Sequence, residues 1–421
     1  MTPTLLLDLD DTLLGNKLGT FLPAYFKALA SHWSRHVEPD RFVSTLISST
    51  QRMIQNQRPD RTLKEVFDDS FYPTLGLNSE EVQADFNAFY AEVFPTLQTL
   101  TKRRERAIEL IEYAFDCGYQ VVIATNPLFP RTAILQRLEW AQISAQRYPY
   151  QLITSYETFH FTKPNPAYYA EILARLGWPA GPVAMIGDDL ENDIYPARRL
   201  GLAAFWITQN GESPPDGKFK PSGAGGLAEV IPWLESGPSD HLKPDFSSTD
   251  SIIATLRATP AGLDALTDDL SPELFTIRPE PGEWCLAEIL CHLRDVEVEV
   301  NLPRYLKVIQ ETDPFLPGMV TDPWADERQY ICQDGLSALA EFSQARLETL
   351  GLLDNLDPAD WHRPARHAIF GPTDLKELTS ISAGHDRLHL QQFRRTLQMV
   401  PSKFRILDAG PNANDSGIDF S

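Results

Sequence analysis

Two carboxylates at positions 8 and 10 could carry out nucleophilic chemistry on a phosphate ester. Asp8 and Asp10 stand at the end of an apolar run, and alternation along a strand would bring both out on related sides of its carboxyl end. One carboxylate can attack phosphorus and form an aspartyl-phosphate. The other can protonate the leaving oxygen and then activate the water that cleaves the intermediate.

Three further motifs supply the remaining groups that such a reaction needs. Thr125 and Asn126 follow the apolar run QVVIA, where a hydroxyl and backbone N–H groups can hold phosphoryl oxygens. Lys163 can screen the repulsion between a carboxylate nucleophile and a phosphate dianion. Mg²⁺ prefers hard oxygen ligands and stabilises the equatorial oxygens of a transferring phosphoryl group. The segment GDDLENDI offers such ligands at Asp188, Asp189 and Asp193.

Each motif alone also has a simpler explanation. Two aspartates at a strand end are common, turns are rich in Gly and Asp, and most lysines are solvated. The four motifs nevertheless occur in order, directly after apolar runs or at helix starts. That order favours one shared site over four unrelated features.

Over roughly residues 1–210, the chain resembles the haloacid dehalogenase-like hydrolase superfamily, with DLDDT, ATN, KP and GDDLENDI as its four motifs. The resemblance implies these roles: nucleophile Asp8, general acid/base Asp10, phosphate binding by Thr125 and Asn126, the cation Lys163, and Mg²⁺ ligands Asp8, Asp10 (backbone carbonyl), Asp188 and Asp193. Asp193 could instead support Lys163, and Asp189 has no defined role. The second acid, Asp10, favours phosphate ester or anhydride hydrolysis over dehalogenation.

Alternating strands and helices must position these motifs. Apolar runs predict strands at 4–9, 120–124, 152–154, 183–186 and 203–207, with helices between them. This pattern predicts an α/β, Rossmann-like parallel sheet covered by helices on both faces. The inserted helical segment, about 15–99, resembles the cap that closes over such sites and selects the substrate.

The cap residues leave the substrate open among small phosphorylated metabolites, such as a sugar phosphate, phosphoglycolate or a nucleotide. The arginines of the cap could reach an anionic leaving group, but we expect a solvated helix face at Arg52, Arg58 and Arg61. Its aromatic residues are expected to form the cap core rather than a stacking platform: Phe67, Phe71, Phe86, Phe89 and Phe94.

Histidines in the second half have the spacing of a metal site. His385 and His389 lie four residues apart and therefore on one helix face. With His292 from a facing helix they could bind one divalent ion through three nitrogens. Helical segments at 250–268, 285–311, 335–355 and 373–398 predict an all-α, antiparallel four-helix bundle.

Residues 250–398 resemble the DinB-like superfamily of metal-binding bundles, through Trp284, CHLRDVE and GHDRLHLQQ. The resemblance implies a metal triad of His292, His385 and His389 that binds Zn, Ni or Fe. A metal-dependent thiol S-transferase, a hydrolase and a non-enzymatic metal-sensing or interaction module all stay open for this unit. The nearby acids could accept hydrogen bonds from the imidazoles or form a charged outer face: Asp295, Glu297 and Glu299. His362 and His367 could line the entrance of this site, but we expect them to be loop residues.

Composition sets the boundaries of the units and excludes some partners. We predict a hydrolase domain at 1–235, a linker at 236–249, the bundle at 250–400 and a frayed tail at 401–421. The net charge of −21 argues against nucleic acid and anionic membranes as partners. Four cysteines without a CxxC pair, no signal peptide and no apolar run of about 18 residues predict a cytoplasmic protein without a membrane span. The oligomeric state stays open.

Overall fold

The first unit is built on a parallel sheet. The computed structural model describes residues 2–208, 212–213, 216–236 and 239–399, so the predicted tail lies outside the described residues. The sheet has the strand order β5-β4-β1-β6-β7-β8, and every pair runs parallel. Its strands are β1 Thr4–Leu7, β4 Gln120–Ile123, β5 Leu152–Ile153, β6 Val183–Gly187, β7 Ala203–Ile207 and β8 Gly223–Gly225. The inner strands are almost wholly apolar because helices cover both faces.

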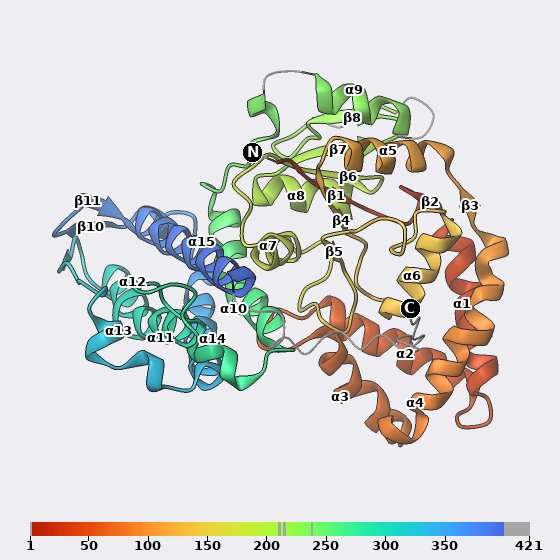
Figure 1. The fold of residues 1–421 in the computed structure, drawn as a ribbon, viewed down its shortest axis with the longest axis horizontal. Coiled ribbons are helices and arrows are strands. Elements are labelled where there is room, and N and C mark those ends of the chain that lie inside the picture. Colours follow the sequence, from red (N-terminus) through yellow and green to blue (C-terminus); the bar gives the residue numbers. More distant parts are fainter. Residues whose placement is uncertain (1, 209–211, 214–215, 237–238, 400–421) are drawn as a thin grey trace, which may run out of the picture.

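The connecting helices confirm the predicted alternation (Figure 1). They are α5 Glu105–Asp116, α6 Arg131–Trp140, α7 Pro166–Arg175, α8 Tyr195–Leu200 and α9 Val230–Glu235. Strand β8 was not predicted. Its sequence, GAG, has no apolar periodicity, and only its pairing with β7 makes it a strand.

A helical cap is inserted between two short antiparallel strands, β2 (Leu14–Gly15) and β3 (Lys102–Arg103). It comprises α1 Leu18–Trp33, α2 Pro39–Ile54, α3 Leu63–Leu75, α4 Ser79–Ala88, a π-helical turn η1 Phe89–Val93 and a 3-10 helix η2 Phe94–Leu100. The predicted aromatic residues fill its interior, with Phe67 stacked on Phe71 at 4.7 Å between ring centroids. Arg58 pairs with Asp60 on the exposed side, which supports the solvated-face interpretation.

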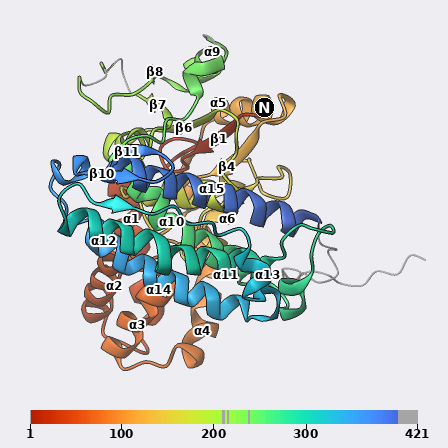
Figure 2. The same cartoon turned by 90° about the vertical axis from the view of Figure 1, so that its left-hand side faces the viewer.

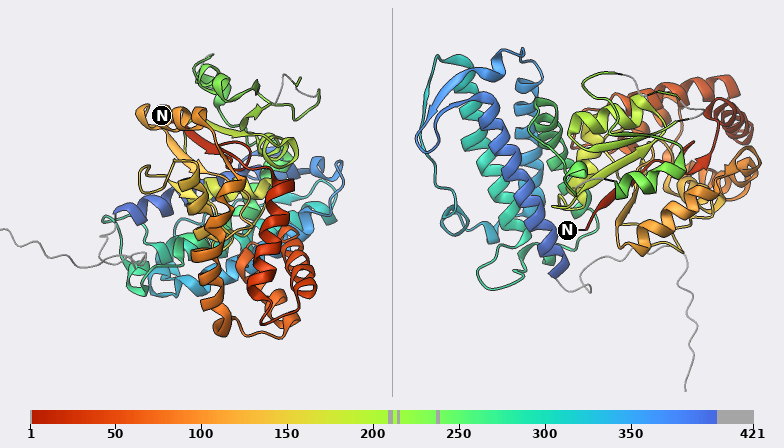
Figure 3. Two further views of the ribbon diagram at one scale, coloured as in Figure 1. Left: turned by 90° about the vertical axis from the view of Figure 1, so that its right-hand side faces the viewer. Right: turned by 90° about the horizontal axis from the view of Figure 1, so that it is seen from above.

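The second unit is a bundle of long helices (Figures 2 and 3). It contains α10 Thr249–Thr267, α11 Leu286–Val296, α12 Leu302–Gln310, the short α13 Trp324–Glu327, α14 Gly335–Leu353 and α15 Leu375–Met399. A π-helical turn, η7 Glu297–Asn301, joins α11 to α12, so the helix predicted at 285–311 is one interrupted helix.

A small sheet in the bundle was missed from the sequence. It has the order β11-β10-β9 and consists of β9 Phe315–Leu316, β10 Pro364–His367 and β11 Gly371–Asp374. These strands have two to four residues and read FL, PARH and GPTD. PARH and GPTD are mostly polar, and FL has only two residues, so none of them shows the alternation of apolar residues that predicts a strand.

The two units pack directly on each other through α10 and α7, which lie side by side in Figure 1. A Cβ atom on Gly262 would lie 2.6 Å from Cβ of Ala174, so only glycine allows this close approach. One hydrophobic cluster continues from Leu5 in the sheet to Leu397 in α15. Arg394 also donates from Nη1 to the carbonyl of Arg175 at 2.7 Å.

A buried histidine joins the units beside the third motif. His160 is fully buried; its Nδ1 lies 3.0 Å from Glu171 Oε1 and its Nε2 lies 3.1 Å from Asp264 Oδ2, which belongs to α10. Burial by itself lowers the pKa of His160, but the carboxylates of Glu171 and Asp264 outweigh burial and raise this pKa to about 9. Arg175, 3.8 Å from Glu171, is a further charged group in this cluster.

We therefore expect His160 to make the stability of the fold depend on alkaline pH. Its folded-state pKa lies above the unfolded value of about 6.5, so its stabilisation is full below that pH and is lost as the pH rises through about 9. When the pH is raised from about 6.5 to about 9.5, the urea unfolding midpoint should fall more for the wild type than for His160→Asn. Equal falls in both proteins would contradict this prediction.

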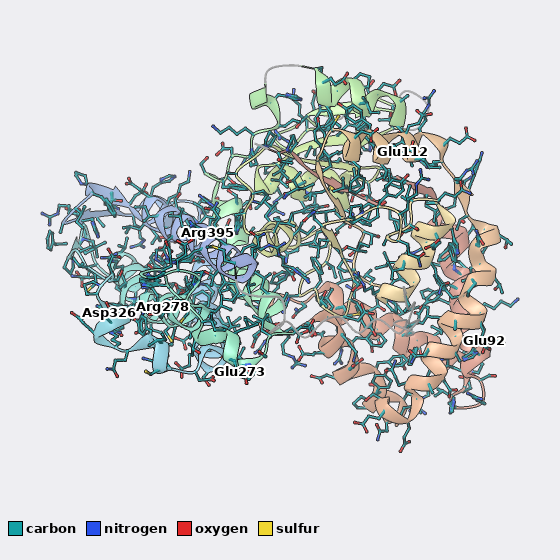
Figure 4. All side chains as sticks on the ribbon, viewed as in Figure 1. Glu92, Glu112, Glu273, Arg278, Asp326 and Arg395 are labelled. Atoms are coloured by element: carbon teal, nitrogen blue, oxygen red, sulfur yellow. The ribbon has the colours of Figure 1, made fainter. Side chains whose placement is uncertain are left out.

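Charged side chains cover the outside of both units. Figure 4 shows Glu92 on the cap and Glu273 and Asp326 on the bundle among these surface groups. Within the described ranges, no helix combines the length and the apolar character that a bilayer crossing requires.

Candidate active site and metal centre

The first, second and fourth predicted motifs lie at the carboxyl ends of the neighbouring strands β1, β4 and β6. Asp8 directly follows β1, and its N–H donates to the carbonyl of Ile186 in β6 at 3.0 Å. Thr125 lies just beyond β4, on the other side of β1, and its carbonyl accepts from Thr154 and Tyr168 at 2.6 and 2.7 Å. This edge is where ligands bind in open α/β sheets.

Lys163 joins the first and fourth motifs. Its Nζ donates to Asp8 Oδ1 at 2.7 Å and to Asp193 Oδ1 at 2.5 Å, and all three side chains are buried. Its backbone N–H donates to Asn126 Oδ1 at 3.3 Å, which connects the second motif. Asp193 therefore supports Lys163, one of the two roles that the sequence left open.

The carboxylates of the site outnumber the cation that neutralises them. Ligand atoms of Asp8, Asp188 and Asp193 lie within 4.8 Å of one another. Burial, and then the charges of Asp193 and Asp11, raise the pKa of Asp188 to about 7. Burial likewise raises the pKa of Asp8, although Lys163 opposes the shift. A hard divalent cation would restore the balance, so these residues fit Mg²⁺.

Asp188 and Asp189 have different local roles. Asp188 accepts from the hydroxyl of Thr12 at 3.2 Å, and its backbone carbonyl accepts from Trp206 Nε1 at 2.8 Å. Asp189 is exposed and caps the π-helical turn η3 (Leu190–Ile194), because its Oδ1 accepts from two backbone N–H groups. The side chain of Asp193 packs directly on Gly187, because a Cβ atom at position 187 would lie only 2.2 Å from Asp193 Oδ2.

Two residues that the sequence did not single out hold Asp10. Arg137 donates from Nη1 to Asp10 Oδ1 at 2.8 Å and to Oδ2 at 2.6 Å, and its side chain is fully buried. Asn16 donates from Nδ2 to Oδ1 at 2.9 Å. Position 137 follows the buried residues Ala133 and Ile134 by four and three positions, so helical periodicity places it on the inner face of α6.

The second predicted site brings the three histidines of the bundle together. His385 Nε2 lies 3.1 Å from His292 Nε2 and 3.0 Å from His389 Nε2. A tetrahedral ion with metal–nitrogen bonds of about 2.1 Å separates its ligand nitrogens by about 3.4 Å, so this convergence suits one ion. Trp284 flanks the site, with its ring 4.9 Å from His292 and 5.9 Å from His389.

The imidazoles are held in the neutral form that binds metals. Burial lowers the pKa of His292 to about 3 and those of His385 and His389 to about 4, with smaller effects from neighbouring charges. His389 Nδ1 lies 2.9 Å from Gln392 Oε1, so a proton on Nδ1 would leave the Nε2 lone pair for an ion. The three histidines therefore fit a divalent cation.

The acids near the triad bind arginines in the structure. Glu297 takes both Nε and Nη2 of the buried Arg346 at 2.9 Å, and Asp386 takes Nη1 of the same arginine at 2.6 Å. Asp295 and Glu299 pair with Arg328, at 2.6 and 2.5 Å. Neither expected role describes all three acids. Asp295 and Glu297 are buried, so the outer-face explanation fits only the exposed Glu299, and each acid pairs with an arginine rather than with an imidazole.

The other two histidines singled out from the sequence, His362 and His367, lie in a 3-10 turn (Asp360–His362) and in strand β10. His362 is exposed and pairs with Asp374 at 3.1 Å. His367 Nδ1 accepts from the backbone N–H groups of Ile369 and Phe370. The exposed His362 agrees with the prediction of a loop residue. His367 ends strand β10 and is buried, so the prediction was wrong there, because a strand as short and polar as PARH has no pattern that reveals it.

Comparisons with known proteins match both regions of the chain. Residues 2–201 match the model of the haloacid dehalogenase-like hydrolase family, and residues 255–393 match that of the DinB superfamily. A curated protein of Geobacillus kaustophilus (strain HTA426), named by prediction a metal-dependent hydrolase, is 26% identical over 150 residues, which are 33% of this chain and 79% of that protein.

Three solved structures that resemble the chain have TM-scores below 0.5. A 2-haloacid dehalogenase from Pseudomonas syringae pv. Tomato DC3000 is 20% identical. The match covers 56% of this chain and 99% of the dehalogenase chain, with a TM-score of 0.41. A HAD phosphatase from Thermococcus onnurineus is 19% identical, with coverage of 56% and 98% and a TM-score of 0.36. YfiT from Bacillus subtilis, a four-helix bundle assigned by prediction as a metal-dependent hydrolase, is 16% identical, with coverage of 39% and 92% and a TM-score of 0.34.

Proposed function

We propose that the first unit is an Mg²⁺-dependent phosphatase of small phosphorylated metabolites, since residues 2–201 match the model of the haloacid dehalogenase-like hydrolases while residues 255–393 match that of the DinB superfamily. The cluster of Asp8, Lys163, Asp188 and Asp193 at one sheet edge carries this proposal. A second acid, Asp10, follows the nucleophile two residues later, as phosphate-ester chemistry requires.

In the proposed reaction, Asp8 attacks phosphorus while the bond from phosphorus to the leaving oxygen breaks. Asp10 gives its proton to that oxygen, so the alcohol departs neutral. Asp10 then takes a proton from a water molecule that attacks the aspartyl-phosphate, which releases phosphate and regenerates Asp8. Lys163 orients the Asp8 carboxylate, and Thr125 and Asn126 would hold phosphoryl oxygens. Bound Mg²⁺ would lower the charge repulsion between nucleophile and phosphate.

A phosphate-release screen over a metabolite panel, with and without Mg²⁺, tests this proposal. We expect turnover of at least one monoester with Mg²⁺, loss of turnover after chelation, and recovery when Mg²⁺ is returned. The reason is that the excess of carboxylates around Asp8 repels a phosphate dianion until a divalent ion is bound. Absence of any turnover, or turnover that chelation leaves unchanged, would contradict the proposal.

We further propose that the bundle is a second, metal-dependent hydrolase site. The support is the convergence of Nε2 atoms from His292, His385 and His389, together with the metal-dependent hydrolase name of the curated relative. Three nitrogen ligands leave at least one coordination position of Zn²⁺, Ni²⁺ or Fe²⁺ for water or substrate. Thiol-dependent turnover that requires His389 and survives loss of Asp8 would favour S-transfer instead.

A further inference from the structure

Arg137 is buried beside Asp10, yet it uses only part of its hydrogen-bonding capacity. Its Nη1 makes both bonds to Asp10, and its guanidinium lies 4.6 Å from the centroid of the Phe129 ring. Its Nε and Nη2 have no hydrogen-bond partner among the described residues, although both atoms are shielded from solvent. Buried donors are nearly always paired. The guanidinium edge formed by Nε and Nη2 therefore indicates a partner that the chain does not itself provide.

The same edge of other arginines in this chain binds carboxylates. Arg346 offers Nε and Nη2 to the two oxygens of Glu297, each at 2.9 Å. Arg58 offers the same two atoms to Asp60 at 2.9 and 2.5 Å. The two N–H groups of this edge are parallel and match the two oxygens of a planar carboxylate. A carboxylate is therefore the expected partner of the edge on Arg137.

The position of Arg137 places that carboxylate on the leaving group. Arg137 contacts Asp10, which protonates the leaving oxygen in the proposed reaction. Phe129 lies below the guanidinium and packs against Tyr25 of the cap helix α1, with 5.2 Å between ring centroids. The guanidinium of Arg137 thus lies near the seam between cap and core, where Gln136 of the same helix also bonds to the cap residue Tyr90 and where opening of the cap would admit a substrate.

We propose that Nε and Nη2 of Arg137 bind a carboxylate in the leaving group, so that the substrates are phosphate monoesters of small hydroxycarboxylic acids. This inference rests on the proposed phosphatase function and narrows its substrate. Of the classes considered from the sequence, it selects phosphoglycolate-like acids over neutral sugar phosphates and nucleotides. The carboxylate must lie within a few bonds of the ester oxygen, because Arg137 also contacts Asp10.

Two phosphonates that differ only in the carboxylate test the binding step without turnover. The full-length protein with Mg²⁺ is titrated calorimetrically with 3-phosphonopropionate and with propylphosphonate, whose carbon–phosphorus bonds the proposed reaction does not break. We expect the carboxylate compound to bind at least about tenfold more tightly, because it gains two charge-assisted hydrogen bonds. Arg137→Lys should abolish this ratio, since an ammonium group has no planar edge.

Arg131→Lys is the matched control, because Arg131 lies on the same helix but is exposed. It should keep the ratio of the wild type. A purely structural role for Arg137 would weaken both ligands equally and leave the ratio unchanged, which would overturn the inference. So would a wild-type protein that does not distinguish the two phosphonates, even if Arg137→Lys failed to fold.

Turnover separates this inference from the proposed function. We expect the wild type to hydrolyse 2-phosphoglycolate with a higher kcat/KM than ethyl phosphate, and Arg137→Lys to remove the difference. Hydrolysis that depends on Asp8 but shows no carboxylate preference would refute only the inference about Arg137. A carboxylate preference in binding, with no Asp8-dependent hydrolysis of either ester, would refute the phosphatase function alone.

Discussion

Replacing Asp8 with asparagine is expected to lower Mg²⁺-dependent phosphate release by at least about a thousandfold, because the reaction loses its nucleophile. The amide has nearly the same shape as the carboxylate, so it can still occupy the place beside Lys163. Phosphate release from the most active ester of the panel, measured at saturating Mg²⁺, gives the comparison.

The same substitution should not weaken the fold. The pKa of Asp8 is raised in the folded protein, mainly by burial, so its ionised carboxylate destabilises the folded state at neutral pH. A neutral amide removes this penalty, and the unfolding midpoint of Asp8→Asn is expected to equal or exceed that of the wild type. Loss of activity together with a lower midpoint would indicate disruption of the fold rather than of the reaction.

Asp189→Asn provides the matched control for Asp8→Asn. Asp189 lies next to the predicted metal ligand Asp188, but it is exposed and caps a helical turn. Asparagine caps helices about as well as aspartate, so this variant should keep most of the activity. If Asp8→Asn retained more than about a tenth of the wild-type rate, the assignment of the nucleophile would be wrong.

Replacing His389 with alanine is expected to reduce the metal content of the bundle from about one ion per chain to near zero. Two nitrogens bind a divalent ion much more weakly than three. Elemental analysis of the protein purified without chelators measures the ion. The wild type should also lose thermal stability when a strong chelator is added, because a ligand that binds only the folded state stabilises it.

The chelator should change the unfolding midpoint of His389→Ala much less than that of the wild type, and Mg²⁺-dependent phosphate release should persist in this variant. His362→Ala is the control, because His362 is exposed and pairs with Asp374 outside the triad. A wild-type protein without bound ion, or an unchanged ion content in His389→Ala, would refute the metal site.

Much of the arrangement was predictable because the motif residues follow apolar runs. The runs before Asp8 and Thr125 form neighbouring strands β1 and β4, so both residues reach the same sheet edge. The spacing of His385 and His389 likewise places them on one helix face whatever the tertiary structure. These relations depend on local periodicity, which the sequence contains.

Contacts between distant segments were not predictable in the same way. Arg137 lies 127 positions after Asp10, and its partner is determined by how α6 packs near the cap. The periodicity of α6 shows that position 137 faces inward, but it does not say what it meets there. The docking of α10 on α7 was also missed, because an isolated glycine such as Gly262 has no local pattern that indicates a helix contact.

The close contact between Gly262 and Ala174 also affects how the chain can be divided. Composition predicted a linker at 236–249. Within it, Asp245 donates its N–H to the carbonyl of Gly201 at 3.0 Å, and Phe246 packs on Trp178 with 5.0 Å between ring centroids. Truncating the chain there would expose apolar surface that is now buried between the two units. Because Asp245 and Phe246 pack against the first unit, we expect each half expressed alone to be less stable than it is within the full chain.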